Sequence, residues 1–423
     1  MKLVCAPNDT VPYVENALNV TLYGQAKEPN YASAGEAAKR EILKAGLVAA
    51  PKAWDFLSIA LSVVTADAAG LRSESPDGWT RTFSLQISVG DPEFWNSKSK
   101  DLSSALSFLT TDLWEFSFVS GGIQPAPPRK SVRPNEDAVV LLSGGLDSLI
   151  GAIDLAKQGH KLYAVSNVVR GDGDNQDAFA QAIGEGLSHL ALNHNATPPW
   201  KREQSQRARS IIFLAFGILV ATALGRYRDG EEVPLFLCEN GFIAINPPLT
   251  GTRIGSLSTR TAHPEFLNRI RNLLVDAGVK VKIENPYEFS TKGEMMSSCK
   301  DQKMLEALAS RSVSCGRYRV FKYTHCGRCI PCQIRRASFL KANYTDKTNY
   351  VYANLARNDA EHANFDDVRA VAMALAEVKD DGFDTWLGSA LSYPEMRDLH
   401  KVRALIERGL GELSDLHKTF GVK

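Results

Sequence analysis

Two groups of residues have the types and the spacing that chemistry needs. The first is a run of small and polar residues, Ser143–Ser148, with the sequence Ser-Gly-Gly-Leu-Asp-Ser. It follows an apolar run at 138–142 and opens an apolar-periodic segment that ends at Gly159. This pattern predicts a buried strand, a tight loop and the N-terminus of a helix. Backbone N–H groups and the positive end of the helix dipole converge in such a loop, so it is a site for phosphate anions.

The residue types within this loop fit a nucleotide and its metal ion. Glycines remove the side chains that would keep a phosphate away from the backbone, and serines add hydroxyl donors. The aspartate can hold Mg²⁺ against the same phosphates. We therefore expect the phosphates of a ligand and Mg²⁺ to bind at Ser143, Gly144, Gly145, Leu146, Asp147 and Ser148. A Walker loop is excluded because it needs a lysine and a longer glycine spacing, and residues 132–156 contain no lysine.

The second group consists of four cysteines with the spacing C-x10-C-x2-C-x2-C: Cys315, Cys326, Cys329 and Cys332. Four thiolates so close together, with Gly327 and Pro331 to bend the loop, predict a closed, tetrahedral and structural Zn²⁺ site. An iron–sulfur cluster is the alternative, because C-x2-C-x2-C also occurs in ferredoxins. The other three cysteines are isolated in the sequence and are expected to be ordinary buried residues.

The elements that position these groups alternate along the middle of the chain. Apolar runs predict strands at 138–142, 162–166, 235–238 and 279–283. Periodic segments predict helices near 178–192, 209–224 and 264–276. Such alternation indicates an α/β fold with a doubly wound parallel sheet and ligands at the carboxyl ends of its strands. Glu239 and Asn240 follow one of these strands and are candidates for substrate binding.

The regions on either side have a different texture. Residues 1–120 show alternating strands and one helical stretch and are predicted to form an α+β accessory domain. A Gly- and Pro-rich segment at 121–135 is predicted to be a linker to the core at 136–342. Residues 343–423 are predicted to be helical.

Composition limits the environment and the partners. The chain has 423 residues with 49 basic and 48 acidic side chains, a net charge of +1, which gives no strong signal for nucleic-acid binding. The longest apolar run, 211–224, is too short to span a membrane and is predicted to be a helix buried against the sheet. The first residues lack the apolar region of a signal peptide, so we expect a cytoplasmic protein.

The Ser143–Ser148 loop after a strand resembles the pyrophosphate loop of the ATP pyrophosphatase superfamily, whose members cleave ATP between the α and β phosphates. Together with the four cysteines and Arg335, the loop is similar to that of the 7-cyano-7-deazaguanine synthase family. This resemblance covers about residues 136–342. It implies an ATP-dependent C–N ligase that adenylates 7-carboxy-7-deazaguanine, adds ammonia to give an amide, and dehydrates the amide to a nitrile in the route to queuosine.

The resemblance also assigns residues. Ser290–Glu294 is similar to the Thr-Lys-x-Glu turn of the family, and Arg209 to the arginine of its Arg-Asn pair, so Lys292 and Arg209 are candidate catalytic cations beside Asp147. The backbone of 163–167, including Val165 and Ser166, is expected to face adenine. Pro264-Glu265-Phe266 resembles a segment near the family's substrate pocket, which makes Glu265 and Phe266 expected substrate contacts. Arg335 reaches the site or only packs beside it.

The chain departs from the family in two respects. The acidic residue and the Cys-Arg pair that precede Pro-Glu-Phe in the family are replaced at 255–263, where His263 is either a general base or a structural residue. The chain is also longer than family enzymes, and in this it resembles members encoded in bacterial antiphage defence systems. In such a protein the acceptor is ammonia or an amine on a partner protein that the added domains hold, and the chain forms an oligomer or acts alone.

Two other functions stay open at this point. A sulfur-inserting tRNA enzyme uses the same loop, but it would need a basic RNA-binding face and a catalytic pair of cysteines outside the metal site. A non-catalytic subunit that senses a nucleotide would bind ATP in the same loop without turnover.

Overall fold

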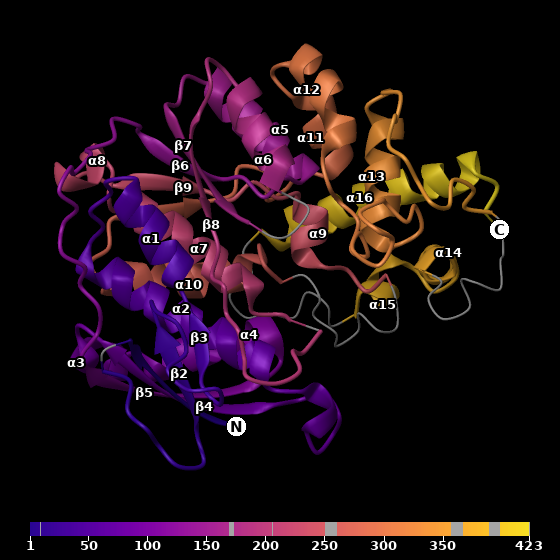
Figure 1. The fold of residues 1–423 in the computed structure, drawn as a ribbon. Coiled ribbons are helices and arrows are strands. Elements are labelled where there is room, and N and C mark those ends of the chain that lie inside the picture. Colours follow the sequence, from indigo (N-terminus) through magenta and orange to yellow (C-terminus); the bar gives the residue numbers. More distant parts are fainter. Residues whose placement is uncertain are drawn as a thin grey trace.

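The computed structural model describes residues 1–8, 10–168, 173–204, 206–249, 260–356, 367–388 and 398–422. Two parallel five-stranded sheets lie on either side of a double layer of helices, and further helices cover the C-terminal side (Figure 1). Within these residues, no helix combines the length and the apolar character that crossing a bilayer requires.

The first sheet has the strand order β3-β2-β1-β4-β5. Its strands are β1 (Lys2–Pro7), β2 (Leu18–Leu22), β3 (Ala32–Ala34), β4 (Thr82–Val89) and β5 (Leu113–Ser120). Its helices are α1 (Glu36–Lys44), α2 (Pro51–Ala69), α3 (Pro92–Ser97) and α4 (Ser99–Thr110). Every strand pair is parallel, so the region is α/β and the expectation of an α+β domain was wrong. Helices lie in the connections from β3 to β4 and from β4 to β5, as parallel pairing requires. The connections from β1 to β2 and from β2 to β3 contain no helix, so the sequence did not show a regular alternation of strands and helices.

The second sheet has the order β10-β9-β6-β7-β8 and is parallel throughout. Its strands are β6 (Ala138–Leu141), β7 (Leu162–Asn167), β8 (Ser188–Leu192), β9 (Val233–Phe236) and β10 (Val281–Glu284). The helices between them are α5 (Leu146–Lys157), α6 (Gly173–Ala182), α7 (Arg209–Ala221), α8 (Gly225–Arg228), α9 (Gly241–Ile245) and α10 (Pro264–Asp276). The segment 178–192, predicted to be helical, is divided between the end of α6 and strand β8.

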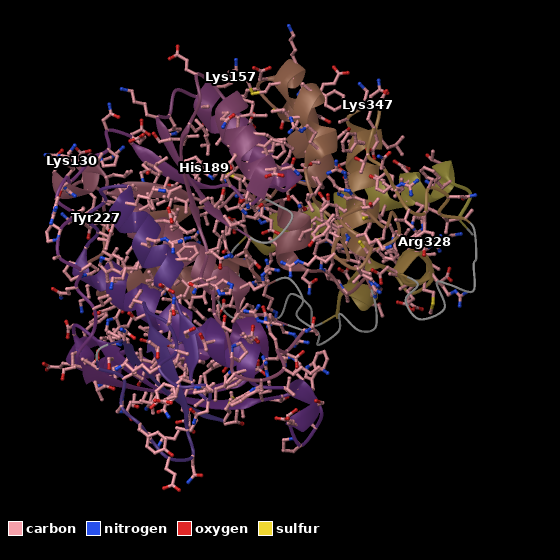
Figure 2. All side chains as sticks on the ribbon, in the orientation of Figure 1. Lys130, Lys157, His189, Tyr227, Arg328 and Lys347 are labelled. Atoms are coloured by element: carbon pink, nitrogen blue, oxygen red, sulfur yellow. The ribbon has the colours of Figure 1, made fainter. Side chains whose placement is uncertain are left out.

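The two sheets share one hydrophobic core. α2 and α4 cover one face of the first sheet, α7 and α10 cover one face of the second, and α2 packs directly on α7. As expected from its apolar run, α7 is buried against the second sheet, and its other side is covered by α2. Figure 2 shows side chains filling the space between these layers. Residues 1–120 are therefore packed against the core of the region that follows.

Helices cover the remaining surfaces. α11 (Lys292–Ser298) and α12 (Gln302–Leu308) pack with α5 on the other face of the second sheet. The C-terminal residues that the structure describes are helical, as predicted: α14 (Asp367–Asp380), α15 (Phe383–Leu387) and α16 (Leu399–Thr419). Together with α9 and α13 (Ile330–Lys341) they form a separate apolar cluster.

A buried ion network lies within residues 1–120. The Arg81 guanidinium contacts Asp67 Oδ1 at 2.5 Å and Asp112 Oδ2 at 2.6 Å, and Arg72 contacts Asp112 Oδ1 at 3.0 Å. Nearer the carboxyl end of the same sheet, Asp55 of α2 accepts the N–H of Gly90 at 2.6 Å. These charges are removed from water, so each depends on its partner.

Replacing Arg81 by methionine leaves Asp67 and Asp112 buried without their shared cation. We expect Arg81→Met to lower the free energy of unfolding by about 3–5 kcal/mol, measured by urea denaturation. The matched control is Arg40→Met, whose side chain is 64% exposed beside Glu41 and should change stability by no more than about 0.5 kcal/mol. Equal midpoints for the two variants would contradict the assigned role of the network.

Candidate nucleotide and metal site

The Ser143–Ser148 loop lies where the second sheet changes direction. The chain runs from β6 outward through β7 and β8 and later adds β9 on the other side of β6. Ligands of such sheets bind at the carboxyl ends of the strands at this switch point. Gly144 has φ +83°, a left-handed conformation that favours glycine. Its carbonyl accepts the N–H of Val313 at 3.0 Å, so a loop from the C-terminal part of the core braces the turn.

The two serines of the loop fix its shape. The Ser148 hydroxyl accepts the N–H of Ser143 at 3.2 Å, lies 3.0 Å from the Ser143 hydroxyl, and donates to the Gly145 carbonyl at 3.0 Å. Ser148 is nearly buried, whereas the Ser143 side chain is exposed toward the cavity. Ser148 therefore orders the loop, and Ser143 presents its hydroxyl to a ligand.

Asp147 holds the centre of the site. The Lys292 ammonium lies 2.7 Å from Asp147 Oδ1, and the side-chain amide of Asn240 donates to Asp147 Oδ2 at 2.7 Å. Asn240 follows β9 and Lys292 follows β10, so the ends of neighbouring strands deliver both partners. Asp147 is 8% exposed, and the Lys292 ammonium compensates its charge.

One cavity of about 270 Å³ opens on this pair. Its wall includes the loop, Asp147, Lys292, Glu239 and Thr261. Burial raises the pKa of Glu239 to about 7; the Asp147 carboxylate adds to this shift and the Lys292 ammonium opposes it. Asn240 is absent from the wall, because its amide oxygen caps α9 at Ile243 N while its N–H₂ group holds Asp147. Asn240 thus supports the site from behind, and Glu239 is the one of the two that lines this cavity.

A second cavity of about 360 Å³ adjoins the first and shares the Ser143 side of the loop. Arg207 and Arg209 give it a positive wall. Asn167 Oδ1 and Ser210 Oγ are also on this wall, buried and without a hydrogen-bond partner among the described residues. Buried polar atoms are rarely left unpaired, so these two point to a polar ligand. Cations and unsatisfied polar groups beside the loop fit a nucleotide.

The strand residues expected beside adenine face elsewhere with their side chains. Val165 is fully buried in the core, and the Ser166 hydroxyl donates to the Leu142 carbonyl at 2.6 Å. His189, labelled in Figure 2, lies 2.8 Å from Ser166 Oγ and 3.0 Å from Asp177. The residue of this strand that reaches the cavity is the next one, Asn167.

Two residues assigned by the Pro-Glu-Phe resemblance do not line either cavity. Phe266 is fully buried in the core shared by the two sheets, and Glu265 pairs with Arg269 at 2.5 Å. Both positions lie on the buried side of α10, so the expected substrate contacts are corrected to a core residue and an ion pair. The altered segment at 255–259 lies outside the described residues.

Two further candidates take structural positions. Arg335 is fully buried and donates to Ser312, Ser314, Ala309 and Thr348, so it packs behind the loop that braces Gly144. His263 caps α10 by accepting the N–H of Glu265 at 3.2 Å, and burial lowers its pKa to about 3.

The sequence reasoning missed the residues that hold the second cavity open. Asp67, on α2, accepts the N–H groups of Arg207 and Ala208 at 2.8 Å each. Arg207 also donates to Thr111 at 2.8 Å. Thus residues 1–120 support one wall of the candidate nucleotide site. No local pattern around Asp67 indicates this contact, because its partners lie about 140 positions away.

The four cysteines form one cluster, and their ligand atoms all lie within 4.8 Å of one another. The Sγ atoms of Cys315 and Cys329 are 3.9 Å apart, as are those of Cys326 and Cys332. This spacing fits a tetrahedral zinc ion, for which Zn–S bonds of about 2.3 Å place sulfurs about 3.8 Å apart.

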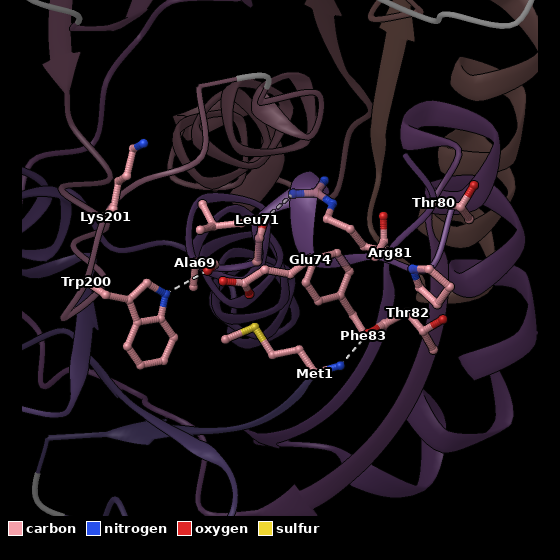
Figure 3. Close-up of a pocket in the computed structure, with 13 residues that line it drawn as sticks. Met1, Ala69, Leu71, Glu74, Thr80, Arg81, Thr82, Phe83, Trp200 and Lys201 are labelled. Atoms are coloured by element: carbon pink, nitrogen blue, oxygen red, sulfur yellow. Dashed lines mark hydrogen bonds between the residues drawn. The ribbon is translucent and has the colours of Figure 1, made fainter. Parts of the chain in front are cut away.

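A third cavity lies elsewhere and has a different character. It measures about 670 Å³ and lies at the amino ends of β1 and β4, with Met1, Glu74, Phe83 and Trp200 on its wall (Figure 3). The Trp200 indole N–H donates to the Ala69 carbonyl at 2.7 Å. No residue of the Ser143–Ser148 loop and no cysteine of the cluster takes part in this wall.

Zinc in the cysteine cluster should contribute to folding, because the apo cluster would crowd four thiols. We expect about one zinc per chain by elemental analysis, and less zinc with a lower melting temperature in Cys326→Ser. The control is Cys299→Ser, outside the cluster, which should keep its zinc. Bound iron with visible absorbance, or full zinc in Cys326→Ser, would contradict the assignment.

The raised pKa of Glu239 makes stability depend on pH. Between its ordinary value of 4.5 and about 7, the folded protein keeps this proton while the unfolded chain releases it. Stability should therefore fall with rising pH in this window, by up to about 1.4 kcal/mol per pH unit from this one group. Urea unfolding of Glu239→Gln should show a shallower slope, and the exposed control Glu15→Gln an unchanged one. Parallel slopes for Glu239→Gln and wild type would contradict the assignment.

The chain is similar to known proteins over about half of its length. Residues 261–343 match the family model described as "Queuosine biosynthesis protein QueC". The chain is 32% identical over 234 residues to the 7-cyano-7-deazaguanine synthase of Methanococcus aeolicus, covering 51% of this chain and 99% of that protein. It is 25% identical over 247 residues to the corresponding enzyme of Methanocaldococcus jannaschii, with the same coverage.

A synthase of the same name from Clostridium kluyveri is 25% identical over 240 residues, which cover 50% of this chain and 97% of that protein. About half of the chain therefore has no counterpart in these relatives. The chain belongs to the 7-cyano-7-deazaguanine synthase family, as a member with additional length.

Proposed function

We propose that this protein uses ATP to activate the carboxylate of a 7-carboxy-7-deazaguanine-type substrate. A carboxylate oxygen attacks the α phosphorus of ATP and pyrophosphate leaves, which gives an acyl adenylate. An amine nitrogen then attacks the acyl carbon and AMP leaves. With ammonia as the amine, the product is the amide that family enzymes activate again and dehydrate to a nitrile.

The observation that carries the proposal is the convergence of the phosphate loop and the Asp147–Lys292 pair on one cavity. The loop N–H groups and the Ser143 hydroxyl would stabilise pyrophosphate as charge migrates onto it. Asp147 would hold Mg²⁺, which neutralises phosphate charge when bound. The Lys292 ammonium faces the same wall and would stabilise the departing phosphate or orient the carboxylate.

Glu239 is placed to handle the proton of the acceptor. It lies on the wall of the same cavity, at the end of β9. A carboxylate whose pKa is about 7 can take up a proton near neutral pH and release it again. We assign Glu239 the role of general base toward the attacking amine.

The second cavity would take the nucleoside part of ATP. Arg209 and Arg207 supply cations on its wall, and Asn167 and Ser210 supply unpaired polar atoms. In this proposal the adenine-binding end lies beside strand β7, as the family resemblance implies, with Asn167 as the contributing side chain.

Sulfur insertion into tRNA is disfavoured by the cysteines outside the metal cluster. Such an enzyme needs a reactive thiolate, and burial raises the pKa values of Cys5 and Cys299 to about 12 each. Cys238 is on the wall of the first cavity, but burial, with smaller contributions from Asp154 and Asp147, raises its pKa as well. A buried neutral thiol is inert toward sulfur transfer.

The added length bears on the acceptor. The parts of the chain outside the resemblance at about 136–342 supply the first sheet and the C-terminal helices α14, α15 and α16, both packed against the core. We propose a cytoplasmic role in bacterial antiphage defence, in which the activated carboxylate passes to ammonia or to an amine of a partner protein held by these additions.

The test is to incubate the protein with ATP, Mg²⁺ and 7-carboxy-7-deazaguanine and to measure AMP and pyrophosphate. We expect AMP formation that requires the carboxylate, and a loss of about 10²- to 10³-fold in Asp147→Asn, because the variant loses the charge that holds the cation. Mass spectrometry of the deazaguanine product with and without ammonium identifies the acceptor.

The control variant is Asp137→Asn. Asp137 lies directly before β6, at the end of the strand away from the Ser143–Ser148 loop, and its carboxylate contacts His160. The variant should retain wild-type turnover. If the folded, zinc-loaded protein releases no AMP with this substrate, the proposed activity is wrong. AMP formation at the wild-type rate in Asp147→Asn would remove Asp147 from the mechanism.

A further inference from the structure

Helix α16 lies outside the residues matched by the family model, yet it contacts the turn that presents Lys292. It runs along α13 and also touches α9 (Figure 1). The turn itself, Thr291-Lys292-Gly293-Glu294, opens α11 with a capping box. The Thr291 hydroxyl accepts the N–H of Glu294 at 3.1 Å, and the Glu294 carboxylate accepts the N–H of Thr291 at 2.9 Å.

Two residues of α16 hold both halves of this capping box. The Glu412 carboxylate accepts a hydrogen bond from the Thr291 hydroxyl. The Arg408 guanidinium donates to Glu294 Oε1 at 2.5 Å and to the Phe289 carbonyl at 2.8 Å. Positions 408 and 412 are one turn apart on the same face of a helix, so one rigid element grips the turn at two points.

The contact is too close for a side chain to intervene. A Cβ atom at Gly293 would lie 2.6 Å from Glu412 Oε1 and 2.7 Å from Lys341 Cγ. Thr291 is 1% exposed and Glu412 is 9% exposed, so water does not replace the bond between them. The turn is therefore clamped between α13 and α16.

The same helix also supports the other partner of Asp147. A Cβ atom at Gly409 would lie 2.3 Å from the Phe242 ring, and Leu405 lies against Gly241. Both contacted residues belong to α9, which begins directly after Asn240. Helix α16 thus contacts both helices that present the partners of Asp147. Asn240, directly before α9, binds Oδ2, and Lys292, the first residue of α11, binds Oδ1.

We propose that Glu412 and Arg408 are positioning residues of the active site, which fix the 291–294 turn so that Lys292 stays opposite Asp147. The C-terminal helix is then part of the catalytic apparatus of this lengthened family member, and its own residues touch no substrate. The kinetic side of this inference rests on the proposed function. The positional side does not, because it concerns where the Lys292 ammonium lies.

The first experiment measures the position of Lys292 without catalysis. Lys292 is 5% exposed in its ion pair, so acetic anhydride should acetylate it slowly in the wild type, as quantified by mass spectrometry. We expect Glu412→Ala to accelerate acetylation of Lys292 while the exposed Lys303 reacts at its wild-type rate. Glu412→Gln keeps an oxygen that can accept from Thr291, and it should restore most of the protection.

The second experiment measures AMP formation by the same variants. Misplacement of a catalytic group by about 1 Å costs on the order of 10²-fold, so Glu412→Ala should lower kcat by about 10- to 100-fold and leave the KM for ATP nearly unchanged. Glu407→Ala is the control on the same helix, because Glu407 is half exposed and pairs with Arg403, away from the 291–294 turn. It should behave as the wild type in both experiments.

The outcomes separate the two proposals. Slow acetylation of Lys292 in a folded Glu412→Ala protein would overturn the positioning role, whatever the activity. If the wild type forms no AMP but Glu412→Ala exposes Lys292, the proposed activity fails and the positioning role stands. Should Glu412→Ala not fold, Arg408→Ala removes the hydrogen bonds to Glu294 and to the Phe289 carbonyl, through a side chain that is 44% exposed, and decides the same question by the same readouts.

Discussion

The site depends on keeping one nearly buried carboxylate between partners that arrive from different strand ends. Asp147 lies in the first turn of α5, and its oxygens are bound by Lys292 and Asn240. These residues are far apart in the sequence, and only a parallel sheet with β6 next to β9 and β9 next to β10 brings them together. Loss of one partner would leave a charge in a place where water cannot solvate it, so the register of these strands and the chemistry are fixed by the same contacts.

The local parts of this arrangement could be predicted from the sequence. The strand, loop and helix at 138–157 follow from a motif and a periodicity that are complete within about twenty residues, and the helix at 264–276 has the predicted bounds. The cysteines could be grouped for the same reason, since their spacing is itself the signal. Motif spacing and periodicity report on neighbours in the chain, and these features need nothing more.

Features that depend on distant neighbours could not be predicted. The strand at 188–192 was hidden in a helical expectation because its identity comes from pairing with β7. Phe266 looked like a pocket residue because its motif does not say which side of α10 faces the core. The double role of Asn240, as a helix cap and as a partner of Asp147, and the grip of Asp67 on the 207–208 backbone appear only when the sheets are assembled.

The two sheets have the same strand order but differ at the edge where ligands bind. In each, a central strand is followed by two strands on one side, and the later pair is added on the other. At the second sheet this edge carries the phosphate loop and two cavities. Near the corresponding edge of the first sheet, the Asp55 carboxylate already accepts the N–H of Gly90. Topology therefore provides a place for a ligand, and the side chains decide whether it stays open.

The packing of α2 on α7 has a consequence for how this protein can change in evolution. Beyond its first residues, which line the second cavity, α7 is covered by its own sheet and by α2 of residues 1–120. A descendant that lost residues 1–120 would expose apolar side chains of α7 to water and would tend to aggregate. Polar substitutions on α7 would have to accumulate before such a deletion. While residues 1–120 remain, however, each substitution would bury a polar group and lower the stability of the fold. We therefore expect residues 1–120 and the core to be inherited together.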